Sequence, residues 1–349
     1  RASVQFHCSL PVVPAMARRQ RVEAREMAAL VTRLSLALAA LLSGCAAQPG
    51  IRFGYYDKTC PGAERIVFRE TTRIVRASPD LAASLLRLHY HDCFVQGCDA
   101  SVLLDSADGS PTEKDAIPNE SLRGFDAVAR VKDKLEKACP ATVSCADLLA
   151  LMARDAVVLS KGPSWPVALG RRDGRTSRAE NCGELPPLYG NITVMIEVFA
   201  AKGLDVKDLV VLSAGHTLGK AHCSSFADRL YNGSIRSTDP TLDGRYADRL
   251  RMRCRGPSDS SAAAEMDAGS CGTFDTSYYR QVARRRGLLR SDAGLMEHPF
   301  AGAYVRRAAT GRYDGEFFRD FRVSMAKMGA IGVLTGNQGK IRTKCNLVN

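Results

Sequence analysis

The chain has 349 residues, of which 45% are hydrophobic and 25% charged, and this composition is typical of a globular protein rather than a disordered or collagen-like one. After the N-terminal region no run of 18 apolar residues occurs, which excludes a polytopic membrane protein. The formal net charge of +12 is compatible with nucleic acid, an anionic membrane or an acidic polysaccharide, and selects none of them.

Residues 1–47 are interpreted as a leader. Arg33 precedes a short apolar run and then small residues that end at Ala47, a pattern typical of a secretory signal peptide, here about residues 27–47. The apolar run is too short to span a bilayer. Two alternatives are a buried helix and a bacterial lipoprotein signal that would place acyl chains on Cys45.

Removing this leader changes both the charge and the cysteine count. It carries six Lys/Arg and two acidic residues, so the charge of residues 48–349 falls to +8. Of the twelve cysteines, two lie in the leader and ten remain. An even number of cysteines in a secreted chain predicts disulfides.

The rest of the chain is predicted to be mainly α-helical, with very little β structure. Apolar residues recur at helical spacing in several segments, and Ser144 followed by Asp147 resembles a capping box that opens a helix. Trp165–Leu169 is the best strand signal, while residues 105–119 and 255–272 resemble polar loops. In chain order, the helices are expected around 81–92, 125–135, after 144, 209–216 and 319–329.

One of these helices carries a pair of side chains suited to proton transfer. Arg87 and His91 are four residues apart, so they share a helix face. The imidazole can accept and return a proton, and the guanidinium can stabilise negative charge on a leaving oxygen. Such a pair is also common on protein surfaces. A zinc site formed by His89 and His91 is an alternative, but two residues at this spacing point apart.

Oxygen-bearing side chains gather in two places. Asp92, Asp99 and Ser101 lie close to Gly97 in the sequence, and this combination suits a hard cation such as Ca²⁺; a solvated acidic loop is the alternative. A second centre combines His216, flanked by small residues, with a later cluster of possible oxygen ligands at Asp267, Ser270, Thr273 and Asp275.

From about Phe53 to Asn349 the chain resembles the secreted plant-type (class III) haem peroxidases. The matching runs are LLRLHYHDCFVQGCDAS at 85–101, TEKD at 112–115, VSCAD at 143–147, GRRDG at 170–174, VLSAGHTLG at 211–219 and GKIRTKC at 339–345. The resemblance implies a single peroxidase domain, residues 48–349, with haem b between two helical halves. The distal half would be about 48–185 and the proximal half about 186–349.

The resemblance also implies a role for each matching residue. His216 corresponds to the axial ligand of the haem iron, and Asp292 to the carboxylate that accepts its hydrogen bond. His91 corresponds to the distal base, Arg87 to its partner, and Asn119 to the residue that binds the other imidazole nitrogen. Pro186 matches a proline near the haem edge, where a phenolic donor would bind. The reaction would reduce hydrogen peroxide to water while donors are oxidised in one-electron steps.

Two calcium ions and a set of disulfides are further implications of the resemblance. The distal ion would bind Asp92, Val95, Gly97, Asp99 and Ser101, with Glu113 linked through water, and the proximal ion Thr217, Asp267, Ser270, Thr273 and Asp275. The family's disulfides correspond to Cys60–Cys139, Cys93–Cys98, Cys145–Cys345 and Cys223–Cys254. Because the cysteine count is even, a fifth bridge between Cys182 and Cys271 is hypothesised, with two buried free thiols as the alternative.

Several positions depart from the family pattern or carry a modification signal. Met266 stands where an aromatic residue often lies beside the proximal histidine, and Tyr90 where phenylalanine is common. Asn191 and Asn232 begin glycosylation sequons. Asn119 also begins a formal sequon, which we expect to be unused because this side chain should face the haem pocket.

The predicted protein is therefore a secreted monomeric peroxidase of the cell wall or apoplast, with the vacuole left open. Its partners would be hydrogen peroxide, small phenolic donors and an anionic wall polysaccharide. No nucleic-acid partner is expected, because the basic residues are dispersed, and no membrane association after signal cleavage. The alternative is a binding protein that kept the fold without the activity, which the presence of all five haem-site residues disfavours.

Overall fold

The computed structural model describes residues 50–231, 237–257, 259 and 261–349. The predicted leader and the sequon at Asn232 lie outside these residues. Residues 49–349 group into one compact unit. No helix within the described residues is both long and apolar enough to cross a membrane.

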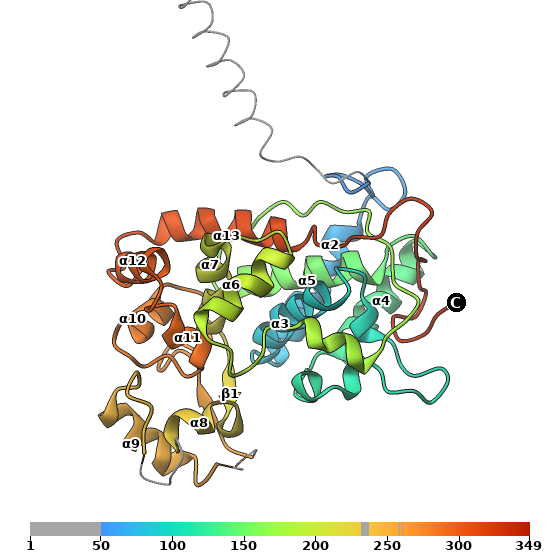
Figure 1. The fold of residues 1–349 in the computed structure, drawn as a ribbon. Coiled ribbons are helices and arrows are strands. Elements are labelled where there is room, and N and C mark those ends of the chain that lie inside the picture. Colours follow the sequence, from blue (N-terminus) through green and yellow to red (C-terminus); the bar gives the residue numbers. More distant parts are fainter. Residues whose placement is uncertain (1–49, 232–236, 258, 260) are drawn as a thin grey trace, which may run out of the picture. The chain divides into compact units, whose positions relative to one another are not determined.

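The described unit is mainly α-helical, as predicted (Figure 1). Its helices are α2 (Ala63–Ala77), α3 (Leu81–Val95), α4 (Phe125–Ala138), α5 (Cys145–Leu159), α6 (Ile192–Ala201), α7 (Val206–Leu212), α8 (Ala227–Leu230), α9 (Gly244–Arg253), α10 (Ser277–Ala283), α11 (Arg290–Gly294), α12 (Pro299–Ala308) and α13 (Asp314–Met328). Short 3₁₀ turns connect them: η1 (Ser101–Leu103), η2 (Glu113–Asp115), η3 (Ile117–Asn119), η4 (Ala179–Glu184), η5 (Ser213–Thr217) and η6 (Cys223–Phe226).

The strands are few and short. In the part of the chain that the structure describes, β1 (Lys220–His222) pairs antiparallel with β2 (Ala263–Glu265), and Ala221 lies opposite Ala264. The predicted strand at 165–169 is wrong: this segment is extended, but its only ladder contact among the described residues is a bridge from Leu169 to Arg52. The expected loop at 255–272 contains β2.

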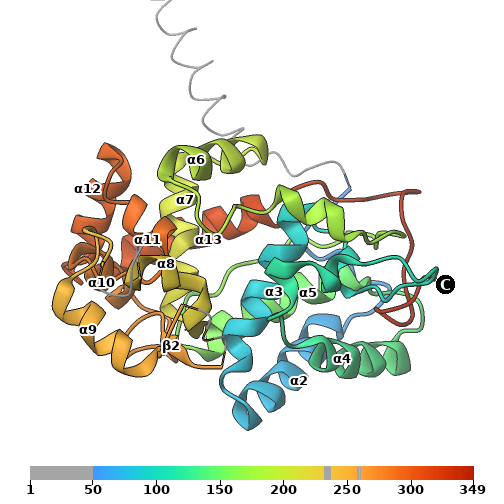
Figure 2. The ribbon, with the colours of Figure 1, turned by 60° about the horizontal axis from the view of Figure 1, so that its bottom comes forward.

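Helices α3 and α5 lie side by side at the centre of the helical core, and α2 and α4 pack beside them (Figures 1 and 2). Leu88 of α3, Val131 of α4 and Leu148 of α5 are fully buried. Helix α4 presents one apolar stripe to its neighbours, whereas α3 and α5 are buried on almost every side. This packing holds α3, which carries Arg87 and His91, rigidly in the core.

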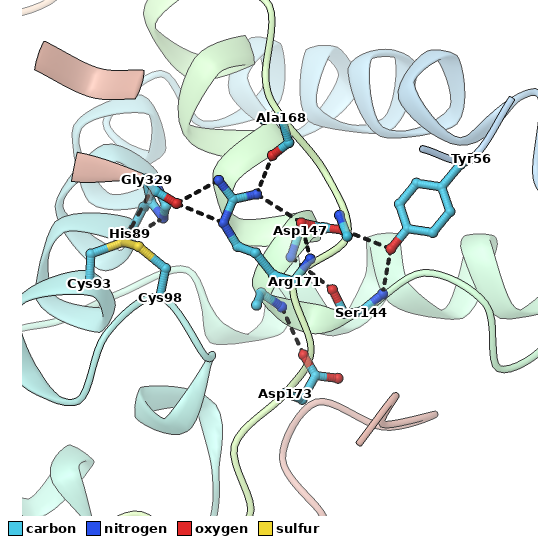
Figure 3. A network of polar contacts seen from close by, with 12 residues as sticks. Tyr56, His89, Cys93, Cys98, Ser144, Asp147, Ala168, Arg171, Asp173 and Gly329 are labelled. Carbon is cyan, nitrogen blue, oxygen red and sulfur yellow. Dashed lines mark hydrogen bonds and ion pairs between the residues drawn. A yellow bond between two sulfur atoms is a disulfide. The ribbon is translucent and has the colours of Figure 1, made fainter. Parts of the chain in front are cut away.

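The start of α5 is only half of the predicted capping box. The Ser144 hydroxyl accepts a hydrogen bond from the Asp147 N–H at 3.1 Å, which confirms the cap. The Asp147 carboxylate does not return to Ser144. It accepts from the Tyr56 hydroxyl at 2.7 Å and from the Arg171 guanidinium at 2.8 Å (Figure 3). Arg171 in turn donates to the carbonyl of Gly329, so this buried carboxylate ties three distant segments together.

Four disulfides are present, joining the pairs that the resemblance implied: Cys60–Cys139, Cys93–Cys98, Cys145–Cys345 and Cys223–Cys254. The hypothesised fifth bridge is wrong, because Cys182 and Cys271 are free thiols. Their surroundings differ. The sulfur of Cys182 contacts Asn119, whereas the Cys271 thiol lies against Glu265 beyond β2. An even count predicts pairing only when the last two cysteines meet in space.

Candidate active site

Helix α3 places Arg87 and His91 on one face, as the spacing predicts. The Arg87 Nε–H donates to His91 Nε2 at 3.1 Å. On the other side of the ring, His91 Nδ1 lies 2.6 Å from Oδ1 of Asn119. An amide oxygen only accepts, so Nδ1 must carry the proton and Nε2 the lone pair. The two contacts together assign the tautomer of a buried imidazole.

The surroundings of His91 keep it neutral. Burial lowers the pKa of this imidazole, and the Arg87 charge lowers it further, to about 3, against the opposing hydrogen bond to Asn119. His91 is therefore an unprotonated base at any pH near neutrality. A neutral imidazole can accept a proton from an acidic ligand, and the neighbouring guanidinium can stabilise the negative charge that the ligand is left with.

His89 does not join this pair. Its ring lies in the core beside the Cys93–Cys98 disulfide, with Nδ1 3.6 Å from the Cys93 sulfur (Figure 3). Although His89, Asp92 and Cys93 bring ligand atoms within 4.8 Å of one another, the Cys93 sulfur is in a disulfide and offers no thiolate. The structure therefore gives no support to the zinc alternative.

One loop holds both partners of His91. The Asn119 amide nitrogen donates to the Glu113 carbonyl at 2.8 Å. Arg87 donates to the Pro118 carbonyl at 2.9 Å and to the Ser121 hydroxyl at 3.0 Å. Ser121 has no local sequence signal for this role, because it meets Arg87 only after the loop folds back onto α3.

On the proximal side, α7 continues directly into the 3₁₀ turn η5, which contains His216. His216 Nδ1 lies 2.8 Å from Oδ1 of Asp292, near the start of α11. The same carboxylate accepts from the Tyr278 hydroxyl at 2.8 Å and from the Leu289 N–H at 2.9 Å. Burial alone would raise the pKa of Asp292, but His216 and these hydrogen bonds outweigh it, and the pKa is lowered.

His216 and Asp292 together suit a haem iron, with His216 as the ligand and Asp292 as its hydrogen-bond partner. With Nδ1 bonded to a buried carboxylate, His216 can offer Nε2 to a metal, and its side chain is 35% exposed while Asp292 is 2% exposed. Imidazole backed by a carboxylate is an established arrangement for a metal ligand. His216 and Asp292 therefore fit a haem iron bound at Nε2 of His216.

The acidic cluster next to the distal residues, which includes Asp92 and Glu113, contains buried oxygens that are suited to a cation. Asp92, Ser101 and Glu113 are fully buried, yet among the described residues both carboxylate oxygens of Asp92, the Ser101 hydroxyl and Oε2 of Glu113 have no hydrogen-bond partner. Burial, together with the charges of Asp99 and Glu113, raises the pKa of Asp92 well above its ordinary value. Unpaired buried oxygens of this kind are the donors that a hard cation requires.

The proximal oxygen cluster also comes together. The Thr217 hydroxyl donates to Asp267 at 3.0 Å and approaches the Thr273 carbonyl at 3.3 Å. The Ser270 hydroxyl donates to Asp275 at 2.9 Å. The Ser277 hydroxyl contacts both carboxylates, a residue that sequence reasoning missed. Here the hydroxyls and carboxylates are hydrogen-bonded to one another. The possible cation ligands are therefore close together, but unlike those of the distal cluster they already have partners.

Comparisons with known proteins agree with this geometry. The family model described as Peroxidase matches residues 67–311. Peroxidase 1 of Oryza sativa subsp. japonica is 56% identical over 324 residues, which cover 92% of this chain and 98% of the relative. Peroxidase 39 of Arabidopsis thaliana is 48% identical over 327 residues, covering 91% and 100%. The chain belongs to the plant class III family of haem peroxidases. It is therefore an enzyme that oxidises donors with hydrogen peroxide.

The remaining predicted positions of this peroxidase have specific surroundings. Tyr90 packs edge-on against the His91 ring, with centroids 5.3 Å apart, so its aromatic body fills the place expected for phenylalanine. Met266 is half-buried against an apolar cluster that includes Phe226, Leu230 and Tyr246, and it donates its N–H to the Gly219 carbonyl. Pro186 is half-buried directly after the buried Leu185.

The two sequons that the structure describes differ in accessibility. Asn119 is 2% exposed and its amide is bonded to His91 and Glu113, so the folded protein has no room for a glycan on this side chain. Asn191 is exposed and caps α6 by accepting from the Val194 N–H at 3.0 Å. The expectation that Asn119 is unused is therefore supported by its burial.

Proposed function

We propose that His91 is the proton acceptor for hydrogen peroxide in this peroxidase, with Arg87 and Asn119 as its partners. The observation that carries the proposal is the pair of opposite contacts on one imidazole, a donated bond to Asn119 and an accepted bond from Arg87. This arrangement keeps Nε2 basic. Haem b, when bound to His216, supplies the iron that binds peroxide and accepts its oxidising equivalents.

In the proposed mechanism, His91 Nε2 takes the proton from one peroxide oxygen and returns it to the other, so that water can leave. Arg87 stabilises negative charge on the departing oxygen. Asp292 accepts a hydrogen bond from His216 Nδ1–H, which would make this imidazole more electron-donating toward an iron that it holds. Tyr278 and the Leu289 N–H keep Asp292 in place.

Absorbance spectroscopy and stopped-flow kinetics test this function. The purified protein should show a Soret band, and rapid mixing with hydrogen peroxide should change it before any donor is added. Guaiacol should then be oxidised at the expense of peroxide. A haem protein that binds peroxide slowly and oxidises no donor would contradict the proposal.

We also propose that two calcium ions support the haem pocket. The distal ion would bind the oxygens of Asp92, Val95, Gly97, Asp99 and Ser101, with Glu113 linked through water, and the proximal ion those of Thr217, Asp267, Ser270, Thr273 and Asp275. The unpaired oxygens of Asp92 support the distal ion. Metal analysis of the purified protein should find two calcium ions for each haem; a single ion would remove the proximal site from the proposal.

The physiological donor is proposed to be a small phenol oxidised near Pro186, and the protein is proposed to be a secreted monomer that acts in the cell wall. An anionic wall polysaccharide is the proposed macromolecular partner. Six exposed arginines support it: Arg245, Arg249, Arg253 and Arg255 in and after α9, and Arg284 and Arg285 after α10. The two groups adjoin, because the N–H of Asp243, the N-terminal cap of α9, donates to the Arg285 carbonyl at 2.8 Å.

Retention on a polygalacturonate column tests that partner. Replacing Arg249 and Arg253 with Glu should lower the salt concentration needed for elution. Replacing Arg319 and Arg322, two exposed arginines on α13, with Glu is the matched control. Equal losses in both pairs would mean that net charge alone causes binding.

A further inference from the structure

A free thiol lies directly behind the distal catalytic residues. Cys182, in η4, is buried and 6% exposed. Its sulfur lies 3.3 Å from the amide nitrogen of Asn119 and 3.8 Å from the carbonyl oxygen of Glu113. Asn119 in turn contacts His91, so only one side chain separates the sulfur from the distal base.

The sulfur completes the hydrogen bonding of the Asn119 amide. A primary amide has two N–H donors and one oxygen. The oxygen faces His91, one N–H can reach the Glu113 carbonyl at 2.8 Å, and the other can reach the sulfur of Cys182. If the amide turned over, its oxygen would face the Glu113 carbonyl, another acceptor, and its NH₂ would face the N–H of His91. Two acceptors on the nitrogen side therefore favour the observed orientation.

That orientation decides which nitrogen of His91 is basic. An oxygen at Asn119 requires the proton on Nδ1 and leaves Nε2 unprotonated, so that it accepts from Arg87 in this structure and can take a proton from peroxide. An amide NH₂ there would favour the opposite tautomer. We propose that Cys182 is a positioning residue for the peroxide reaction, because its sulfur holds the Asn119 amide in the orientation that keeps Nε2 of His91 basic. The proposal rests on the proposed roles of His91 and Asn119.

Variants at position 182 test the role of the sulfur. Cys182→Ala and Cys182→Val both remove the acceptor, one leaving space and the other filling it. Each should slow the bimolecular reaction with hydrogen peroxide roughly threefold to tenfold, as expected for one neutral hydrogen bond. Oxidation of the donor should be unchanged. Cys182→Ser keeps a donor and an acceptor and should restore most of the rate. Cys271→Ser, at the other free thiol, is the control and should match the parent.

Cyanide binding gives a readout without turnover. Hydrogen cyanide must also lose its proton as it binds to ferric haem, and the Soret band reports binding directly. The two variants that lack an acceptor should slow cyanide association by the same factor as the peroxide reaction, with unchanged haem content. Slowing of the peroxide reaction without slowing of cyanide association would overturn the proposal, and so would a Ser variant as slow as Ala.

A double-mutant cycle separates this inference from the proposed function. Asn119→Ala alone should slow the peroxide reaction roughly 10- to 100-fold, the cost that is typical when a metal-binding histidine loses its hydrogen-bond partner. Adding Cys182→Ala should then cost nothing more, because the sulfur acts through the amide. Additive losses would reject the positioning role of Cys182. An Asn119→Ala enzyme with the parent rate would instead reject the proposed role of Asn119.

Discussion

The Nδ1 atom of His91 lies 2.6 Å from the side-chain oxygen of Asn119, a residue 28 positions away in the sequence. This contact fixes the tautomer of His91. It places the imidazole proton on Nδ1, so that Nε2, which faces Arg87, can act as the base. Four of the following predictions concern the haem site and its calcium support, and one concerns the thiols.

Replacing His91 with Ala should leave haem bound and slow the reaction with hydrogen peroxide by roughly 10²–10⁴-fold, the usual contribution of a positioned acid–base group. The rate constant is measured by stopped-flow mixing at the Soret band. His222→Ala, at an exposed position on β1, is the control and should retain the parent rate. A fast His91→Ala enzyme would show that another group accepts the proton.

The pH dependence of the peroxide reaction should reflect the low pKa of His91. Burial and Arg87 lower this pKa to about 3, and the base works only when unprotonated. The rate should therefore stay level from pH 7 down to about pH 4 and fall as the pH approaches 3. Measurement requires mixing the enzyme into acid at the moment of reaction, so that slow acid unfolding does not contribute. A loss of rate centred near pH 6.5 would mean that His91 titrates as an ordinary exposed imidazole.

Replacing Asp92 with Asn should remove one bound calcium ion for each protein molecule. The carboxylate oxygens of Asp92 are fully buried and have no hydrogen-bond partner in the part of the chain that the structure describes, so a cation is their expected counter-charge. Chelation of calcium should lower the melting temperature of the parent by several degrees, and the variant should respond less. Asp105→Asn, at an exposed position, is the control. Equal calcium content in the two variants would place the ion elsewhere.

Replacing Asp292 with Asn should raise the reduction potential of the iron, because His216 loses the anionic partner that makes its imidazole electron-rich. Spectroelectrochemical titration measures the change. Tyr278→Phe removes one of the hydrogen bonds that lower the pKa of Asp292 while leaving the carboxylate. The more basic carboxylate should accept more strongly from His216, so the potential of this variant should move in the opposite direction, downward. A rise in potential in both variants would be inconsistent with the contacts at Asp292.

Alkylation of the unfolded, unreduced protein should modify two cysteines within residues 50–349, namely Cys182 and Cys271. In the native protein Cys271 should react first, because it is half-buried, whereas burial and the charge of Glu113 raise the pKa of Cys182 to about 11 and keep it protonated. Peptide mass spectrometry identifies the modified residues. A single disulfide-linked peptide containing both cysteines would restore the fifth bridge.

Local features of the fold could be predicted from the sequence. The i, i+4 spacing of Arg87 and His91 is a property of any α-helix, and α3 (81–95) places both on one face. Ser144 caps α5 because a hydroxyl next to the first turn needs no distant partner. Matching runs also indicated His216 with Asp292, although these residues lie 76 positions apart.

Other features depend on which segments meet, and only the tertiary structure decided them. Asp147 had the spacing of a capping-box residue, but Tyr56 and Arg171 compete successfully for its carboxylate. Cys182 and Cys271 are not bonded to each other. An even number of cysteines does not show whether the last two lie close enough to pair. Trp165–Leu169 has strand composition, but within the described residues it forms only a single bridge, from Leu169 to Arg52.

The sequence by itself determined a mainly α-helical fold, the placement of Arg87 and His91 on one face of α3, and the family, because helical periodicity and motif order are encoded over short spans. The tertiary structure decided which nitrogen of His91 is basic, and which polar groups, Cys182 and Tyr278 among them, hold the site residues in place. Hydrogen-bond partners are chosen by proximity in space, and each buried donor or acceptor takes the nearest partner that the packed core leaves to it.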